Sequence, residues 1–260
     1  MQTMRRVEFP LRPAASRCAL CPLRSPCLPD SLSADDLARI EQLVARRRRV
    51  LREDVLYRMG DRGGTLYAIR LGHFKSLQAD RRGGQHLTGF QMAGELLGMD
   101  ALGTGLHGST AVALEDSEVC EIPYARLLEL MPRMPGLLAH FHQMLGREIL
   151  REQAVMIFLG NMRADQRLAS FLLDLGERYA MRGYSARSFL LRMSRDDIAG
   201  YLGLTLECIS RQLARFRRNG WIRLDKRAIE LTDRDALLAL AAGLQPALPI
   251  DSDSARAHAA

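Results

Sequence analysis

Long apolar runs and abundant cysteine are both missing from this chain of 260 residues. No stretch approaches the roughly 18 consecutive apolar residues of a membrane-spanning helix. Residues 1–13 carry arginine and proline where a secretory signal needs an apolar segment. Five cysteines are too few, and odd in number, for a secreted disulfide scaffold. We therefore expect a cytoplasmic protein without a membrane partner, whose thiols stay reduced.

Four of the five cysteines are spaced as ligands of one metal site. Cys18, Cys21 and Cys27 lie within ten residues of each other in a proline-rich leader, and Cys120 ends a probable strand. Thiolates are soft ligands that favour zinc, copper(I) or an iron–sulfur cluster over hard cations. Folding would bring Cys120 to the other three and tie the leader to a domain. The spacing does not distinguish zinc from an iron–sulfur cluster.

A redox enzyme with a Cys18–Cys21 dithiol is a third interpretation of these residues. That motif normally opens a helix in a βαβ unit, and the proline-rich leader offers no such pattern. The histidines offer no metal-ligand pair either, because His140 and His142 stand two apart on a predicted helix and face different ways. The sequence therefore predicts no catalytic residue and no enzyme.

Turn residues and composition divide the chain into five predicted segments of an α+β fold. Glycine-punctuated β-rich runs fill residues 50–122 and favour a β-roll or jelly-roll domain. The segments are a cysteine-rich leader at 1–30, the β-roll at 31–124, a long helix at 125–162, a winged helix-turn-helix at 163–243 and a disordered tail at 244–260. The predicted strands are 55–57, 65–69, 74–77, 86–90, 110–114 and 119–122, and the arginines at 46–49 are interpreted as a solvated helix end.

A narrow apolar stripe follows the long predicted helix. Its members are Leu138, Phe141, Leu145, Ile149, Val155 and Leu159, and Glu152 interrupts them. So narrow a stripe on so long a helix favours a coiled-coil seam, and hence a homodimer, over a helix packed only on its own domain. Two Glu152 carboxylates would approach each other in a symmetric parallel dimer, which predicts a weak, adjustable association.

Basic residues concentrate near the C-terminus. Residues 187–227 hold ten basic and four acidic residues, which gives this segment most of the net charge of +7. Within it, Ser194 caps a short helix, Gly203 forms a turn, and Thr205 caps a second helix over 206–216. Residues 221–224 and 228–231 then alternate like a hairpin. These features favour a winged helix-turn-helix that binds double-stranded DNA over a three-helix cluster with a merely solvated basic face.

One face of the second helix carries side chains suited to reading base edges. Arginine pairs bidentately with guanine, glutamate accepts from the cytosine amine, and serine contacts either type of base. Arginines further along the helix are better placed for phosphates. The predicted DNA-binding residues are Glu207, Ser210 and Arg211 for bases, Thr205 at the helix start, and Arg215, Arg217 and Arg218 for phosphates.

Taken in order, these motifs resemble the CRP/FNR superfamily of bacterial transcription regulators and, within it, the oxygen-responsive FNR branch. The resemblance covers the chain from Cys18 to about Leu240. Its most specific marks are Cys18-x2-Cys21-x5-Cys27 with Cys120, the run Gly94-Glu95-Leu96-Leu97-Gly98, the run Val119-Cys120-Glu121-Ile122-Pro123, and YLGLTLECISR at 201–211.

The resemblance implies an oxygen-labile [4Fe-4S] cluster, one per subunit, on the four cysteines. It also implies a homodimer that binds TTGAT-like inverted repeats through the three base-reading residues, contacts RNA polymerase and activates genes of anaerobic metabolism. Oxygen would destroy the cluster, release the leader and weaken the dimer. The alternative is a CRP-superfamily regulator with a structural zinc site and a different effector.

Three details depart from the family or remain outside its pattern. Nucleotide-binding members use an arginine followed by serine or threonine, whereas the matching stretch here is His107-Gly108-Ser109-Thr110, so we expect no cyclic nucleotide. The loop at 80–85, the counterpart of a polymerase-contacting loop, is more basic than expected of FNR. Cys208, within the recognition helix, is interpreted as a packed or half-exposed thiol.

Overall fold

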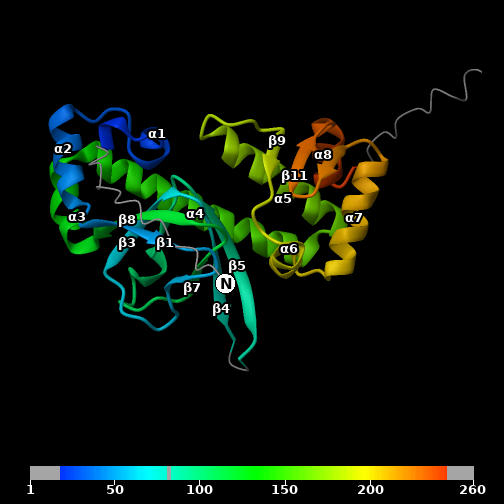
Figure 1. Ribbon diagram of the computed structural model, residues 1–260, viewed down its shortest axis with the longest axis horizontal. Coiled ribbons are helices and arrows are strands. Elements are labelled where there is room, and N and C mark those ends of the chain that lie inside the picture. The colour runs from blue at the N-terminus through cyan, green and yellow to red at the C-terminus, as the bar shows by residue number, and fades with distance from the viewer. Residues whose placement is uncertain (1–17, 81–82, 245–260) are drawn as a thin grey trace, which may run out of the picture.

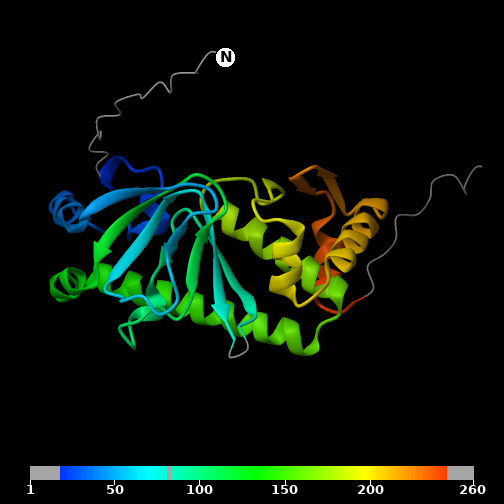
Figure 2. The same ribbon diagram turned by 60° about the horizontal axis from the view of Figure 1, so that its bottom comes forward.

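Two lobes are joined by one long helix, α4 (Pro135–Asn161), which runs along both of them (Figures 1 and 2). This arrangement comes from a computed structural model that describes residues 18–80 and 83–244. Residues 1–17 of the predicted leader and 245–260 of the predicted tail lie outside the described residues. Within the described part, no helix has both the length and the apolar character needed to cross a membrane.

The first lobe, called the β-domain here, contains two four-stranded antiparallel sheets. Their strand orders are β1-β8-β3-β6 and β2-β7-β4-β5. Phe74 and Val119, one from each sheet, are fully buried in the core between them. The strands are β1 (Arg46–Val50), β2 (Val55–Tyr57), β3 (Thr65–Leu71), β4 (His73–Ala79), β5 (Gln85–Met92), β6 (Leu96–Leu97), β7 (Thr110–Ala113) and β8 (Ser117–Pro123). The sheets confirm the predicted β-sandwich class, and β2 to β5, β7 and β8 correspond to the six predicted strands.

Strand β1 corrects the prediction of a helix end at 46–49. The preceding helix, α2 (Ala34–Leu43), begins at the capping box of Ser33 and Asp36 and ends at Leu43. The arginines then pair with β8 in antiparallel register, and the Arg46 guanidinium donates to the Glu121 carboxylate at 2.5 Å. β1 is an edge strand, where charged side chains are tolerated because one side of the strand faces solvent.

Helices and the cysteine-bearing segment cover one sheet of the β-domain. This segment, called the cysteine loop, comprises a 3-10 turn at Cys18–Leu20 and a short helix, α1 (Arg24–Cys27). It packs with α2, with α3 (Tyr124–Leu130) and with the first turns of α4. A short turn at Met131–Arg133 joins α3 to α4, and another short turn lies earlier in the lobe at Met99–Ala101. Leu28, Ile40, Leu127 and Phe141 form the buried centre of that cluster. The cysteine loop is therefore anchored to the β-domain by apolar packing.

The second lobe, called the C-terminal domain, has the predicted helix-turn-helix and wing. Its elements are α5 (Ala164–Ala180), β9 (Ser188–Leu190), α6 (Arg195–Leu202), α7 (Leu206–Arg218), β10 (Ile222–Asp225), β11 (Ala228–Leu231) and α8 (Arg234–Ala241). Its core includes Leu168, Ile209 and Phe216, all with fully buried side chains. The wing hairpin β10–β11 turns at Asp225–Ala228, with Lys226 in the left-handed region at φ 51°. Strand β9, which the sequence analysis did not predict, pairs with β11.

Helix α4 packs on both lobes and leaves two members of the predicted seam, Ile149 and Glu152, exposed. Phe141 is buried within the β-domain cluster, and Leu145 packs partly against the same cluster. Val155 packs partly against the core of the C-terminal domain. The large apolar side chains exposed along this helix are Ile149, Leu150, Met156 and Ile157, and Glu152 is exposed among them. Of the predicted seam, Phe141 therefore stabilises its own subunit, and the side chain of Leu159 lies outside the described residues.

Candidate cysteine site and nucleic-acid interface

The four predicted ligand cysteines line one small cavity between the cysteine loop and the β-domain. Cys18, Cys21 and Cys27 come from the loop, and Cys120 comes from β8. The cavity measures about 60 Å³, and its walls include apolar side chains from α2, β3 and β8. Cys208 does not contribute to it. Among the described residues, no three or more histidine, cysteine or acidic side chains are arranged as a ready metal-coordinating group.

The thiols in this cavity influence each other's ionisation. Burial, followed by the charges of Cys120, Cys18 and Cys21, raises the pKa of Cys27 to about 12. Burial likewise raises the pKa of Cys18 to about 11, with Cys120 as the next contribution. Several thiolates this close together repel one another in a low-dielectric site. The cavity therefore favours protonated thiols unless a positive centre is bound among them.

Three arginines share the cavity with the cysteines. Arg24, Arg47 and Arg70 come from α1, β1 and β3. The Nε atoms of Arg24 and Arg70 are buried and have no hydrogen-bond partner among the described residues. The cavity thus combines four soft thiol ligands with guanidinium groups, which fits a metal–thiolate centre of negative net charge.

The helix-turn-helix forms where the sequence places its caps. Ser194 and Asp197 make a capping box at the start of α6. Gly203 ends α6 in the left-handed region at φ 62°, a conformation that favours glycine. Thr205 then caps α7, because its hydroxyl accepts from the backbone N–H of Cys208 at 3.2 Å. These local signals fix the angle at which α7 leaves the turn.

Helix α7 presents a polar face toward solvent and an apolar face toward the core. Ile209, Leu213 and Phe216 are buried, whereas Glu207 and Arg211 are exposed and Ser210 is half-buried. Hydrogen bonds from its own backbone N–H and from Thr205 lower the pKa of Glu207, so this carboxylate stays ionised. The predicted trio therefore shares one accessible face of the helix, and its contact with bases stays a prediction.

Two arginines near this face differ from expectation. Arg215 donates to the Asp165 carboxylate at 2.8 Å and is only half-exposed, so it ties α7 to α5 in addition to any phosphate contact. Arg195, at the start of α6, reaches the Ser210 hydroxyl at 3.4 Å and is exposed. The sequence analysis counted Arg195 only as part of the basic segment. Arg195 reaches α7 because the capping box places the first turn of α6 beside that helix.

Comparison with known proteins matches both lobes. The cyclic nucleotide-binding domain family matches residues 47–133, and the Crp-like helix-turn-helix domain family matches residues 166–240. The chain is 42% identical over 233 residues to the transcriptional regulatory protein btr of Bordetella pertussis, covering 90% of this chain and 96% of that relative. The chain belongs to the CRP/FNR family. Its Bordetella relative is a transcription regulator, and the matched C-terminal family is a helix-turn-helix domain.

Two further relatives agree with this assignment. The Fumarate and nitrate reduction regulatory protein of Escherichia coli is 39% identical over 227 residues, covering 87% of this chain and 91% of the relative. The solved structure of FixK2 from Bradyrhizobium japonicum superposes with a TM-score of 0.68 at 27% identity, covering 79% of this chain and 99% of that one. The predicted CRP/FNR resemblance and the predicted α+β fold class are both confirmed.

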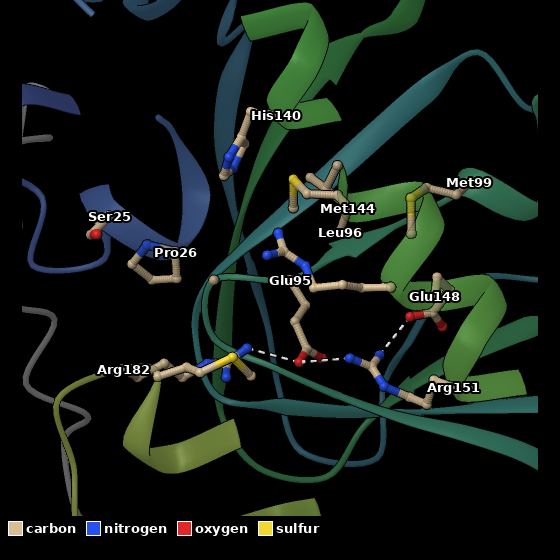
Figure 3. Close-up of a pocket in the computed structure, with 13 residues that line it drawn as sticks. Ser25, Pro26, Glu95, Leu96, Met99, His140, Met144, Glu148, Arg151 and Arg182 are labelled. Carbon is tan, nitrogen blue, oxygen red and sulfur yellow. Dashed lines mark hydrogen bonds and ion pairs between the residues drawn. The ribbon is translucent and has the colours of Figure 1, made fainter. Parts of the chain in front are cut away.

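A buried carboxylate joins the two lobes of this CRP/FNR-family chain. Glu95, in the turn between β5 and β6, accepts from Arg178 of α5 and from Arg182 in the turn that follows α5, each at 2.8 Å. Arg151 of α4 approaches the same carboxylate at 3.5 Å and also binds Glu148 (Figure 3). Burial alone would raise the pKa of Glu95, but the three guanidiniums, led by that of Arg178, outweigh it and lower the pKa to about 2. Glu95 is therefore a charged junction of the β-domain, α4 and the C-terminal domain.

The cysteine loop touches this junction. Gly94 adopts φ +87°, and a Cβ on it would lie 3.0 Å from Pro26 of α1. The His140 ring of α4 is hydrogen-bonded to the backbone of Cys27 and Pro26. Ser25, Pro26, Glu95 and His140 line one cavity of about 260 Å³ (Figure 3). Cys27, one of the predicted ligands, thus directly follows Pro26, the residue that lies against both α4 and the Glu95 turn.

Three other polar contacts connect the lobes. Lys75 of β4 donates to Asp197 of α6 at 2.6 Å. His73 lies 2.6 Å from the Glu115 carboxylate and 3.0 Å from the Tyr179 hydroxyl, and Arg192 binds Glu115 at 2.8 Å. The C-terminal domain is therefore held against the β-domain by polar contacts at several separate points.

The stretch that would hold a cyclic phosphate in nucleotide-binding relatives carries a carboxylate here. Asp100 accepts from the Ser109 backbone N–H at 2.9 Å and from its hydroxyl at 2.8 Å. His107 is buried, stacks on Tyr57 with ring centroids 3.7 Å apart, and lies 3.2 Å from Asp100. A negative charge at this position repels phosphate, which supports the expectation of an effector other than a cyclic nucleotide.

Proposed function

We propose that this protein is an oxygen-sensing transcription regulator that holds one [4Fe-4S] cluster per subunit on Cys18, Cys21, Cys27 and Cys120. The observation that carries the proposal is the convergence of these four thiols, from the cysteine loop and from β8, on one cavity. Similarity to the fumarate and nitrate reduction regulators supports genes of anaerobic metabolism as targets. We infer a cytoplasmic homodimer that binds TTGAT-like inverted repeats and contacts RNA polymerase, usually as an activator.

When bound, the cluster would supply the reactivity toward oxygen. The chain's own residues would link the presence of the cluster to the position of the cysteine loop. The four cysteines hold the cysteine loop against β8. Pro26 then lies against the Gly94–Glu95 turn, and the His140 ring links the loop backbone to α4. Loss of the thiolate ligation would leave the loop anchored by its apolar packing alone, and so short a segment would then open locally more often.

Dimerisation is the second part of the proposed mechanism. The exposed apolar side chains of α4, among them Ile149, Met156 and Ile157, offer a seam to a second copy of the chain. Glu152 lies in the same exposed stretch and opposes close approach of two copies. Two recognition helices would then reach half-sites roughly 34 Å apart, one turn of DNA. A coupling of about 1–3 kcal/mol between cysteine loop and dimer would change DNA affinity about 5- to 150-fold.

Anaerobic purification followed by exposure to air tests the proposal. Iron and sulfide near four per chain are expected, with the visible absorbance and the affinity for a TTGAT inverted repeat lost together in air. Cys27→Ser should lose the cluster, whereas the matched variant Cys208→Ser should keep it, because Cys208 lies outside the cavity. A colourless protein with one zinc per chain and air-insensitive binding would contradict oxygen sensing and favour the structural-zinc alternative.

A further inference from the structure

Arg47 stands directly opposite a cysteine ligand in the sheet. In the antiparallel pairing of β1 with β8, Arg47 is the register partner of Cys120, and on its other side Cys120 pairs with Ala68 of β3. Directly opposed residues project to the same face of a sheet, with Cβ atoms about 4.5–5.5 Å apart. Both side chains line the cysteine cavity. The fold therefore brings a guanidinium to Cys120 through backbone register, independently of the cysteine loop.

The Arg47 side chain interacts with the cysteines it faces. It is half-buried and is hydrogen-bonded to Cys120. Arg70, by comparison, already binds Glu118 at 2.7 Å, and so part of its charge is compensated.

We propose that Arg47 is a positioning residue of the metal site, whose guanidinium is held beside the Cys120 sulfur by the strand register and slows loss of the bound cluster. This role rests on the proposed function. Four thiolates around a [4Fe-4S] core leave a net negative charge in a largely apolar cavity, and a buried charge of that kind needs a partner. Hydrogen bonds to cluster sulfurs also set reduction potentials. Arg47 supplies a positive charge and a hydrogen-bond donor next to Cys120, the ligand that the β-domain contributes.

Three variants of the full-length protein, reconstituted without oxygen, test this role. Arg47→Gln removes the charge, and Arg47→Lys keeps it without the planar guanidinium. Arg49→Gln is the matched control, because Arg49 lies on the same strand two residues away, is exposed and does not line the cavity. The measurements are the rate at which visible absorbance is lost in air and the reduction potential of the cluster, with circular dichroism as the check on folding.

Arg47→Gln should lose its cluster about 10- to 100-fold faster than wild type, the usual effect of removing a partner of a metal ligand. Its reduction potential should fall, because a cation and a donor to sulfur have been removed. Arg47→Lys should recover most of the rate, and Arg49→Gln should match wild type. Equal rates and potentials for Arg47→Gln and Arg49→Gln would overturn the proposal while leaving oxygen sensing intact. A wild-type protein that takes up no iron and sulfide would contradict the proposed function itself and, with it, this role of Arg47.

Discussion

At the scale of single residues, the arginines of α7 have different neighbours and therefore different expected roles in DNA binding. Arg211 and Arg217 are exposed, whereas Arg215 is paired with Asp165. An exposed arginine in the first half of a recognition helix can reach base edges, and one in the last turn is better placed for the backbone. The sequence pattern grouped Arg215 with Arg217 and Arg218, because it contains no sign of the distant Asp165.

Arg211→Ala should weaken binding to the specific site by about 1–3 kcal/mol and relax the base preference at one position of each half-site. The physical reason is the loss of a bidentate contact to guanine. Binding to a panel of single-base operator variants measures this effect. Arg217→Ala is the matched control and should weaken binding to all sequences alike, with a salt dependence lower by about one ion. Identical profiles for the two variants would argue against base readout by Arg211.

At the scale of elements, Glu95 is the residue on which β-domain, α4 and α5 meet. Its carboxylate accepts from Arg178 at both oxygens, at 3.1 and 2.8 Å, and from the Met92 backbone N–H at 3.0 Å. Arg178 is itself buried, donates to the Phe90 carbonyl at 2.5 Å and depends on Glu95 for its charge balance. Removing the carboxylate would leave the buried guanidinium with only the half-exposed Asp174, 3.5 Å away, as its counter-ion.

Glu95→Gln should lower the free energy of unfolding by about 3–5 kcal/mol at neutral pH, the usual result of breaking a buried ion pair from one side. The pKa of Glu95 is lowered from its ordinary 4.5 to about 2 in the folded protein. Its contribution is therefore present above pH 4.5 and is lost as the pH falls from about 4.5 toward 2. Urea unfolding of metal-free protein at pH 7 and at progressively lower pH measures the difference.

Glu177→Gln is a suitable control for Glu95→Gln. Glu177 lies on α5 and pairs with Arg234 at 3.7 Å, but its side chain is 65% exposed. Exposed pairs contribute roughly 0–1 kcal/mol, so this variant should unfold much like wild type. A Glu95→Gln protein as stable as Glu177→Gln across the pH range would remove Glu95 from its role as the junction of the lobes.

The elements that the sequence predicted are those with strong local signals. The caps at Ser194 and Thr205, with Gly203 between them, predict the helix-turn-helix, and alternating apolar residues predict the strands between turns. β1 was missed because four consecutive arginines carry no alternation, and the strand exists through its pairing with β8. The Glu95 junction was missed because the partners Arg178 and Arg182 are far away in sequence and have the spacing of any solvated i, i+4 pair.

The cysteine site was predictable in its members but not in its surroundings. Spacing alone grouped Cys18, Cys21, Cys27 and Cys120, and the cavity contains all four. The arginines that share the cavity come from three separate elements, and only the strand register reveals that one of them opposes Cys120. Long-range pairing of this kind depends on tertiary structure, which a local sequence pattern does not encode.

At the scale of the whole molecule, the exposed stretch of α4 is the surface that distinguishes a monomer from an assembly. Phe141, Leu145 and Val155 are partly or wholly engaged by their own subunit, so a second copy would meet chiefly Ile149, Met156 and Ile157. Glu152 is exposed within this surface. A symmetric parallel association through α4 would therefore bring two carboxylates toward each other.

Glu152→Ala should strengthen the dimer in the absence of a bound cluster. Removing two like charges at about 4 Å in water relieves about 1 kcal/mol, which corresponds to roughly fivefold in the dimerisation constant. Sedimentation velocity at several protein concentrations measures the constant, and Glu129→Ala on α3, an exposed carboxylate outside α4, is the control. A Glu152→Ala protein that dimerises no better than the control would count against a seam at this position.

Asp197 makes contacts within α6 and across to the β-domain, and this affects how fast the C-terminal domain can leave the β-domain and return. Its carboxylate caps α6 through Ser194 and also receives Lys75 from the β-domain. When the contact with Lys75 breaks, the Asp197 carboxylate still accepts from Ser194. Helix α6 therefore keeps its first turn, and α7 keeps its orientation. We expect the domain to detach as a finished, rigid body on the microsecond-to-millisecond timescale of hinge motions, with no refolding step to slow its return.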